Sequence, residues 1–390
     1  MISVPEALGH LFDLVTPVGT ETVPLIDAAN RVLCADVSAR RDQPPFDSSA
    51  MDGYALKSAE AEPDAMFQVI GESAAGSRFD GKIGAGQAVR IFTGAPMPAG
   101  ADRVVIQEDV HVSGRMITLD KGLDDGPHVR PAGADFRVGD TIAAPRRLSD
   151  ADLALLASMN VPDVPVYRKP VVALIATGDE LVMPGDAPGP DQIIASNMFG
   201  LKAMVEAEGA TVRMLPIAAD TERSLKQVFA LAEGADLIVT IGGASVGDYD
   251  LVGPVAADLG MEQSFYKVAM RPGKPLMAGR FGDAVMIGLP GNPVSAMVCG
   301  RLFLVPALRA MMGLPAAAPA RQTAPLGEAI PANGPREHYM RAQLRDGTIY
   351  ALPRQDSSLL SVLSQSHALL IRPVGDGPRA AGEIVEYLQM

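Results

Sequence analysis

Short apolar runs alternate with amphipathic segments between residues 170 and 312, and this alternation constrains the fold more than any other feature of the sequence. The runs are VVALIATG, TVRMLPIA, DLIVTIGG and AVMIGL, and such continuous runs are typical of strands buried on both faces. Between them, SNMFGLKAMVEAEG and TERSLKQVFALAEG carry apolar residues at helical spacing, and each ends at a glycine. This order predicts a doubly wound, mostly parallel α/β sheet domain over 170–314.

The rest of the chain divides into three further predicted domains. Residues 1–45 and 141–169 predict a discontinuous helical N-terminal domain, because MISVPEALGHLFDLV, VPLIDAANRVLCADV and LSDADLALLASMN have helical periodicity. Residues 46–140 carry short Val, Ile and Gly runs that are typical of a β-rich domain. Residues 326–390 follow a proline-rich linker and predict a small C-terminal β domain. The expected fold class is therefore multidomain α/β, with two β-rich domains and a helical N-terminal region.

Charge and cysteine content exclude several classes of function. The 390-residue chain has a formal net charge of -13, which disfavours nonspecific binding to nucleic acid or to an acidic membrane. Its two cysteines, Cys34 and Cys299, are far apart, so we expect no disulfide framework, no cysteine-rich zinc site and a cytoplasmic location. The apolar stretch from Val294 to Met312 contains two arginines and a proline, and therefore predicts a buried helix and not a membrane span.

A glycine-rich turn follows one of the predicted strands. In TIGGASVG, small residues stand where the chain leaves the strand, and small residues let backbone N–H groups approach a phosphate. A plain tight turn explains the pattern equally well, because it matches neither GxGxxG nor a P-loop. The candidate substrate-binding residues at these strand ends are Gly242, Gly243, Ser245, Gly247, Pro290, Gly291, Asn292 and Pro293.

Carboxylates and a basic segment lie in the same predicted domain. Acidic residues follow the strands at Glu180, Asp220, Asp248 and Asp250. Helix capping is the structural alternative for each acid, whereas a group of them can hold Mg²⁺ or another divalent cation with substrate phosphates. The segment YKVAMRPGKP supplies the local positive charge that a polyanionic ligand requires, unless it is only a solvated loop. Its cations are Lys267, Arg271 and Lys274.

Three motifs in the β-rich region complete the set of candidates. They are PPFDSSAMDGYA with Asp52, IFTGAPMPAGAD with Thr93, and VRPAGAD with Asp135. Turn formation accounts for Asp47 and Gly53 in the first motif, but poorly for the Ala-Met pair between them.

Together with ATGDEL, GGASVGDYD, RPGKP and GLPGNPVSA, these motifs resemble the molybdopterin molybdenumtransferase family, the MoeA type, which includes the C-terminal domain of gephyrin. The motifs occur in family order from Pro44 to Ala296, and the domain layout resembles the family over essentially the whole chain. The TGDEL and GG-S-G motifs alone also resemble single-domain molybdopterin-binding proteins.

The resemblance implies a reaction and a set of roles. The family inserts molybdate into adenylylated molybdopterin, and AMP leaves as molybdenum cofactor forms with the help of a divalent cation. Functional positions of the family fall on Asp52, Thr93, Asp135, Glu180, Asp220, Asp250, Lys267 and Arg271. The acids of the α/β domain would organise metal and phosphate, and the basic segment would bind anions, molybdate included. The acids of the β-rich domain would act on the molybdate or pterin side.

The resemblance also implies partners, and two alternative functions remain beside the one it implies. It implies a homodimer in which Asp52 and Asp250 at one site come from different chains, and other proteins of molybdenum cofactor biosynthesis are further candidate partners. A molybdopterin adenylyltransferase is the main alternative function, although a single-domain enzyme would lack PPFDSSAMDGYA. A molybdopterin-binding scaffold is the second alternative.

The sequence departs from the family pattern at three places. Arg271 stands where the family commonly has lysine, and an arginine fork binds anions with a different geometry. The family usually has Asp-Tyr after the glycine turn, whereas this chain has Asp248-Tyr249-Asp250, and the spacing favours Asp250. The stretch Asp356-Ser357-Ser358 replaces a glycine-serine pattern, which leaves its contacts open.

Overall fold

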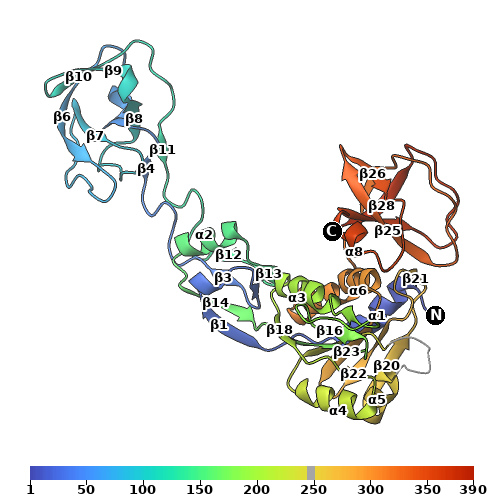
Figure 1. Cartoon of the computed structure of the whole chain (residues 1–390). Coiled ribbons are helices and arrows are strands. Elements are labelled where there is room, and N and C mark those ends of the chain that lie inside the picture. Colours follow the sequence, from blue (N-terminus) through green and yellow to red (C-terminus); the bar gives the residue numbers. More distant parts are fainter. Residues whose placement is uncertain (244–250) are drawn as a thin grey trace.

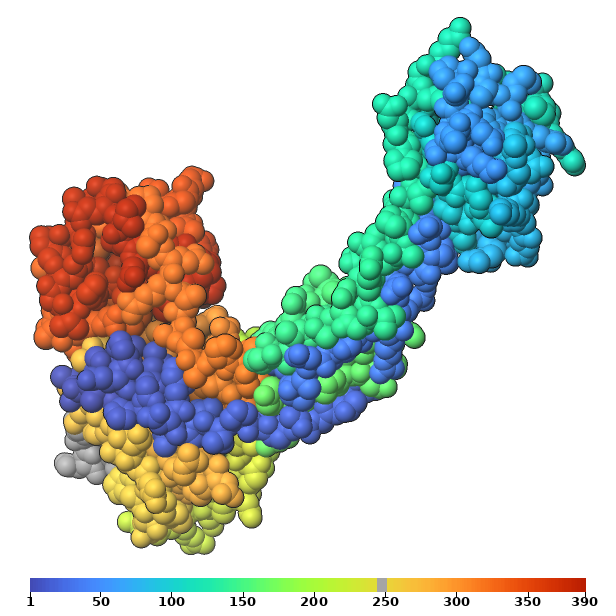
Figure 2. Space-filling model, turned by 180° about the vertical axis from the view of Figure 1, so that it is seen from behind, coloured from blue at the N-terminus to red at the C-terminus, as the bar shows by residue number. Residues whose placement is uncertain are grey.

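The computed structural model describes residues 1–243 and 251–390, which form a long arm (20–167) and a broader body (1–19 and 168–390) (Figure 1). The arm extends from one side of the body and carries a separate sheet at its far end. Figure 2 shows the same bent shape from behind, with an open gap between the C-terminal part of the body and the end of the arm.

The central sheet of the body has the strand order β18-β15-β19-β23-β22-β20. The four apolar runs form β15 (Val171–Ala176), β18 (Thr211–Met214), β19 (Leu237–Ile241) and β23 (Ala284–Leu289), which are parallel. An antiparallel edge follows with β22 (Met277–Phe281) and β20 (Met261–Tyr266). The predicted doubly wound, mostly parallel sheet is confirmed.

Helices cover both faces of this sheet (Figure 1). One face carries α4 (Glu222–Leu231) and α5 (Val252–Asp258). The other carries α3 (Asn197–Ala207) and a continuous helical segment of α6 (Pro293–Cys299), η4 (Gly300–Leu304) and α7 (Val305–Met311). The segment Pro293–Met311 is long and apolar enough to cross a membrane, but 83% of its apolar window is buried inside the body. It is therefore the buried helix that the sequence predicts.

The N-terminal helix α1 (Val4–Leu14) packs on the body and not on the arm. Ser3 and Glu6 form a capping box at its start, and its buried residues, Leu8 and Leu11 among them, join the core of the central sheet. The prediction that placed all of residues 1–45 in one helical domain is wrong for this helix. Its apolar stripe is buried by the same face of the body that buries α3 and α7.

The base of the arm is a small sheet with one helix. Its strands are β1 (Thr20–Pro24), β14 (Asp163–Tyr167), β2 (Val32–Leu33) and β13 (Arg146–Arg147), and β3 (Val37–Ser38) pairs with β12 (Thr141–Ile142). Helix α2 (Asp150–Ser158), which the periodicity of LSDADLALLASMN predicts, is capped by Ser149. The helix predicted from VPLIDAANRVLCADV is wrong, because only the short turn η1 (Leu25–Asp27) is helical there. Its apolar residues pack instead with strands that come from far along the chain.

The distal sheet at the end of the arm has the order β8-β5-β7-β6-β10-β9. The strands are β5 (Gly53–Leu56), β6 (Met66–Ser73), β7 (Gln87–Ile91), β8 (Arg103–Ile106), β9 (Val110–Ser113) and β10 (Met116–Leu119), with η2 (Ser58–Glu60) and η3 (Gln107–Asp109). A separate pair, β4 (Ser48–Ser49) and β11 (Val129–Arg130), lies beside it. The β-rich character expected for this region is confirmed, whereas the predicted domain boundaries stay a prediction.

The C-terminal sheet stands on the α6 side of the body (Figure 1). Its order is β21-β25-β27-β28-β24, formed by β21 (Met270–Arg271), β25 (Glu337–Arg345), β27 (Ala368–Arg372), β28 (Ile384–Gln389) and β24 (Gln322–Pro325). β26 (Thr348–Ala351) pairs with β25, and α8 (Leu360–Ser364) precedes β27. Because β21 belongs to the basic segment, that segment joins the C-terminal sheet to the α/β part.

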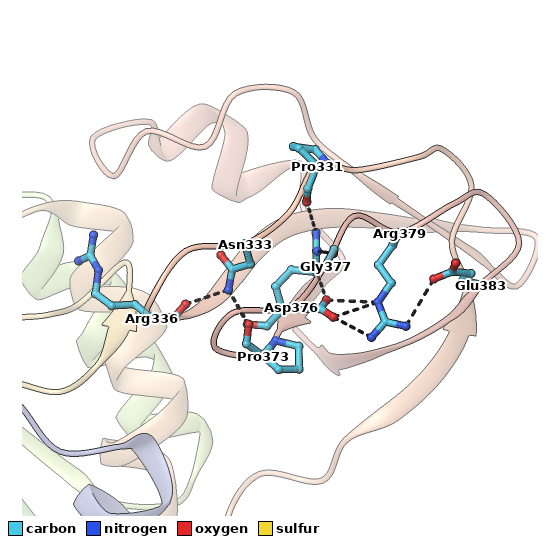
Figure 3. Close-up of polar contacts among 9 residues, drawn as sticks. Pro331, Asn333, Arg336, Pro373, Asp376, Gly377, Arg379 and Glu383 are labelled. Atoms are coloured by element: carbon cyan, nitrogen blue, oxygen red, sulfur yellow. Dashed lines mark hydrogen bonds and ion pairs between the residues drawn. The ribbon is translucent and has the colours of Figure 1, made fainter.

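A polar network fixes the loop before β25 to the end of β27 (Figure 3). Arg372 is only 2% exposed, and it donates to Asp376 Oδ2 at 2.6 Å and to the Pro331 carbonyl at 2.9 Å. Arg379 donates to the other oxygen of Asp376 at 2.7 Å, and the Asn333 amide donates to three backbone carbonyls. The network therefore holds the start of β25 where it pairs with β21.

Candidate functional site

A cavity of about 730 Å³ lies at the carboxyl ends of the parallel strands β15, β19 and β23. Its wall combines these strand ends with Ser196 and Asn197 at the start of α3 and with two short segments, β16 (Leu181–Val182) and β17 (Ile193–Ile194). Ligands of open α/β sheets bind at this edge, as the sequence analysis expects.

The cavity gathers many of the predicted site residues. Glu180, Asp220, Gly242, Gly243 and the loop Pro290–Pro293 all line it. The remaining residues of the glycine turn and its acids, Ser245, Gly247, Asp248 and Asp250, lie outside the described residues.

The backbone of the glycine turn requires glycine at two positions. Gly242 and Gly243 have φ of 93° and 61°, a conformation that other residues rarely adopt. A Cβ on Gly242 would lie 2.8 Å from the Thr177 carbonyl oxygen, and one on Gly243 would lie 2.3 Å from Val252 Cγ2. The Gly242 N–H already donates to the Leu289 carbonyl at 3.1 Å. Gly242 thus lets the turn pack closely against Thr177, and its N–H is not the free phosphate donor that the small residues suggested.

Two carboxylates, Glu180 and Asp220, face this cavity, and the charge of Asp220 is disfavoured there. The Asp220 N–H donates to Asp179 Oδ1 at 3.0 Å, and Glu180 stands next in sequence. Burial raises the pKa of Asp220, and the neighbouring charges of Asp179 and Glu180 raise it further. Within residues 1–243 and 251–390, no group of three or more acids, histidines or cysteines is arranged to hold a metal. A divalent cation nevertheless fits Glu180 and Asp220, because it would relieve the repulsion between carboxylates that line one cavity.

The basic segment forms a tight loop beside the cavity. The Lys267 N–H donates to the Leu276 carbonyl at 2.9 Å, and the Val268 N–H donates to the Lys274 carbonyl at 3.0 Å. Pro275 lines the cavity, whereas none of the three cations does. Arg271 and Lys274 are exposed, and their side chains have no hydrogen-bond or ion-pair partner in the part of the chain that the structure describes. The Lys267 Nζ lies 4.7 Å from the centroid of the Tyr266 ring.

Arg341 is a site candidate that the sequence analysis missed. Its side chain on β25 is fully buried, and its Nη2 donates to the Asp356 carbonyl at 3.0 Å. The other two guanidinium nitrogens have no partner among the described residues. Burial and then the charge of Arg271 lower the pKa of Arg341 to about 10. Burial and the same arginines lower the pKa of His338 to about 4, so this imidazole is neutral at neutral pH.

Thr177 and Asn197 are further cavity residues that were not predicted. The Thr177 hydroxyl is buried under the glycine turn and has no partner in the described segments, and Asn197 Nδ2 donates to the Gly291 carbonyl at 2.7 Å. The ATGDEL motif contains Thr177 and offered a signal for it. Asn197 stands at the start of a predicted helix, where asparagine is common for structural reasons, so the sequence did not indicate it as a site residue.

The three candidates of the β-rich region lie away from this cavity. Asp52 Oδ1 accepts from the Thr93 N–H at 2.7 Å and from its hydroxyl at 2.8 Å, and these bonds lower the pKa of Asp52. Asp135 is exposed near the base of the distal part, where its N–H donates to the Gln43 carbonyl at 2.9 Å. The distal sheet stands at the far end of the arm (Figure 1), so one chain does not bring these residues to its own cavity.

Fold and site together define a multidomain α/β protein with a cavity at the strand ends of its central sheet. Three family models match it in order: the MoeA N-terminal region (domain I and II) over 2–160, a probable molybdopterin binding domain over 173–310, and the MoeA C-terminal region (domain IV) over 323–390. The chain belongs to the MoeA family, which confirms the resemblance seen in the sequence.

Relatives of similar length support this assignment. A molybdopterin molybdenumtransferase of Nostoc sp. is 34% identical, with 100% of this chain and 94% of the relative covered. That of Bacillus subtilis is 32% identical over 99% of this chain and 94% of its own length. The crystal structure of a molybdopterin biosynthesis MoeA protein from Pyrococcus horikoshii is 26% identical, with a TM-score of 0.85 and 100% of both chains covered.

Proposed function

We propose that this chain is a molybdopterin molybdenumtransferase, which inserts molybdate into adenylylated molybdopterin and releases AMP. The observation that carries the proposal is one cavity that combines two carboxylates with a glycine turn, beside a basic loop whose Arg271 and Lys274 side chains have no partner among the described residues. A substrate with an anhydride-linked pair of phosphates and an oxyanion co-substrate complement these charges. The names of the full-length relatives support the same reaction.

In this proposal the body binds the substrate. Glu180, Asp220 and Asp250 hold Mg²⁺ or another divalent cation, which supplies charge neutralisation at the phosphates when bound. Without a covalent nucleophile, catalysis relies on positioning and on stabilisation of developing negative charge. The residues that shape the substrate pocket are Gly242, Gly243, Ser245, Gly247, Pro290, Gly291, Asn292 and Pro293.

Molybdate binds at the basic loop. Arg271 and Lys274 are exposed cations without partners among the described residues. The buried guanidinium of Arg341 lies close enough to Arg271 for the two charges to repel each other. Like charges at such a place repel one another, and a dianion relieves that repulsion. Lys267, whose Nζ lies over the Tyr266 ring, adds positive charge to the same loop.

The two alternative functions fit less well. An adenylyltransferase needs only the α/β part, whereas this chain also matches the family models for the arm and the C-terminal sheet. A pure scaffold gives no reason for two carboxylates in one cavity, or for a neighbouring loop whose Arg271 and Lys274 side chains have no partner in the described part of the chain.

The first test is whether AMP release requires molybdate. Purified protein with adenylylated molybdopterin should release AMP only when molybdate and Mg²⁺ are both present, measured by chromatography of the nucleotide. Omitting each component in turn is the control. Full release without molybdate would identify a hydrolase and contradict the proposal.

The arm completes the site of a second copy in this proposal. Asp52 and Thr93 are bonded to each other at the end of the arm, far from the cavity of their own chain, so a homodimer supplies them from the partner chain. The enzyme works in the cytoplasm, and other proteins of molybdenum cofactor biosynthesis are its further partners.

Mixing two inactive variants tests this shared site. Asp52→Ala and Glu180→Ala homodimers should each be inactive. After co-refolding in equal amounts, half of the dimers are mixed, and each mixed dimer holds one intact site, so about a quarter of wild-type AMP release should return. If mixed dimers form, as shown by differently tagged chains, and no activity returns, Asp52 and Glu180 belong to the same chain's site.

A further inference from the structure

A buried carboxylate joins the arm to the body. Glu208, at the end of α3, is only 8% exposed. Its Oε2 accepts from Arg147 Nη2 of the arm at 2.9 Å, and Arg309 of α7 binds both of its oxygens at 2.9 Å. These two arginines lower the pKa of Glu208 despite its burial, so it is charged at neutral pH. A buried carboxylate that loses such partners is strongly disfavoured, which makes the cluster a stiff joint.

The backbone around Glu208 also touches the arm closely. Gly209 has a positive φ of 95°, and a Cβ added to it would lie 3.7 Å from the Asn30 carbonyl oxygen of the arm. A Cβ on Gly313, just after α7, would lie 2.2 Å from the Tyr167 ring at the end of β14. Both helical segments that meet at Glu208 therefore end against the base of the arm.

The same two segments begin at the cavity. Ser196 and Asn197 at the start of α3 line it, and so does Pro293, which begins α6. The helical segment then continues through η4 and α7 to Arg309. One end of each segment thus forms the site, and the other end holds the arm.

We propose that Glu208 is a positioning residue that fixes the angle between the arm and the body by binding Arg147 from the arm and Arg309 from the body. The angle decides where the arm carries Asp52 and Thr93. The effect on catalysis rests on the proposed function and its shared site, whereas the effect on the arm angle does not.

Interdomain distances measure the angle directly. Spin labels are attached to the full-length chain at two exposed positions, Val112→Cys in the distal sheet and Leu231→Cys in α4. Cys34 is replaced by serine so that it is not labelled, and the buried Cys299 is kept. Labelled chains are diluted with unlabelled chains, so that only distances within a chain are recorded by double electron–electron resonance. The parent should give one narrow distance distribution.

Two variants should release the arm. Glu208→Gln removes the charge of the joint, and Arg147→Met removes only the arm side while the bond between Glu208 and Arg309 stays. Both should broaden and shift the distribution. Arg147→Met keeps the test decisive if Glu208→Gln folds poorly.

A matched control should keep the narrow distribution. Glu206→Gln removes a carboxylate from the same helix, but this one pairs with Lys202 within α3 at 2.6 Å. An unchanged distribution in Glu208→Gln and Arg147→Met, or equal broadening in Glu206→Gln, overturns the proposal.

Kinetics separate positioning from substrate binding. Because the cavity lining is unchanged, Arg147→Met should keep the KM for adenylylated molybdopterin within about twofold. Its kcat for AMP release should fall about tenfold or more, since a misplacement of about 1 Å can cost on the order of 100-fold. If the distance distribution broadens but kcat does not change, Glu208 still fixes the arm angle, but the arm does not complete the site of a second copy. This outcome separates failure of the proposed shared site from failure of the proposed joint.

Discussion

Asp376→Ala is expected to destabilise the C-terminal sheet by about 3–5 kcal/mol, because removing one partner of a buried ion pair leaves the other charge uncompensated. Arg372 would keep only carbonyl partners in a site where its side chain is 3% exposed. The bonds from the Asn333 amide to the Arg372 and Pro373 carbonyls do not involve the Asp376 side chain and should remain.

Amide hydrogen exchange of β25 and β27 measures this loss locally, which suits a chain whose parts need not unfold together. Glu383→Ala is the matched control, because Glu383 binds the same Arg379 at 3.4 Å but both side chains are exposed. Such a surface pair contributes about 0–1 kcal/mol. Equal losses in the two variants would show that Asp376 is not the centre of the network.

In contrast to Asp376→Ala, Arg341→Met is expected to leave the stability of the C-terminal sheet unchanged or to raise it. The same substitution is expected to weaken anion binding. Replacing buried charged groups by apolar side chains of similar volume is often neutral or stabilising. Arg341 is fully buried, with two nitrogens that have no described partner, so its charge opposes folding of β25. Because Arg341 is fully buried and its charge interacts with that of Arg271, it would act on an anion at Arg271 through its charge and not through a hydrogen bond, so its loss should weaken the Kd for molybdate.

The two effects are measured on the same protein. Hydrogen exchange of β25 should slow or stay unchanged, while equilibrium dialysis shows weaker binding of molybdate. Arg345→Met is the control, since Arg345 lies at the exposed end of the same strand and binds Gln343. A Kd unchanged by Arg341→Met would exclude Arg341 from the anion site, and faster exchange would show that its charge stabilises the sheet.

The sequence was most informative where burial alone decides the structure. The runs that became β15, β19 and β23 are apolar on both faces because helices cover both faces of the sheet. The stretch from Val23 to Val37 was different. Its apolar spacing suits a helix, but Asn30 has a positive φ of 61° and the strands pair with residues near 146 and 163–167. Nothing local in the sequence shows those partners.

The candidate site was predictable only where motifs follow the central strands. Glu180, Asp220 and the glycine turn come together because parallel strands end at one edge. Arg341 could not be found, because a single arginine in a strand shows neither its burial nor its lack of partners. The separation of Asp52 from Glu180 depends on the length and direction of the arm, which arise from packing between residues far apart in sequence.

The most direct measurement of the proposed reaction is the amount of molybdenum delivered to the pterin for each AMP released in a single turnover. Protein is mixed with limiting adenylylated molybdopterin, Mg²⁺ and excess molybdate, and the quenched products are separated and analysed for AMP by chromatography and for pterin-bound molybdenum by mass spectrometry. We predict one molybdenum per AMP in the wild type and loss of both products together in Glu180→Ala. AMP released without pterin-bound molybdenum would contradict the proposed molybdenum transfer.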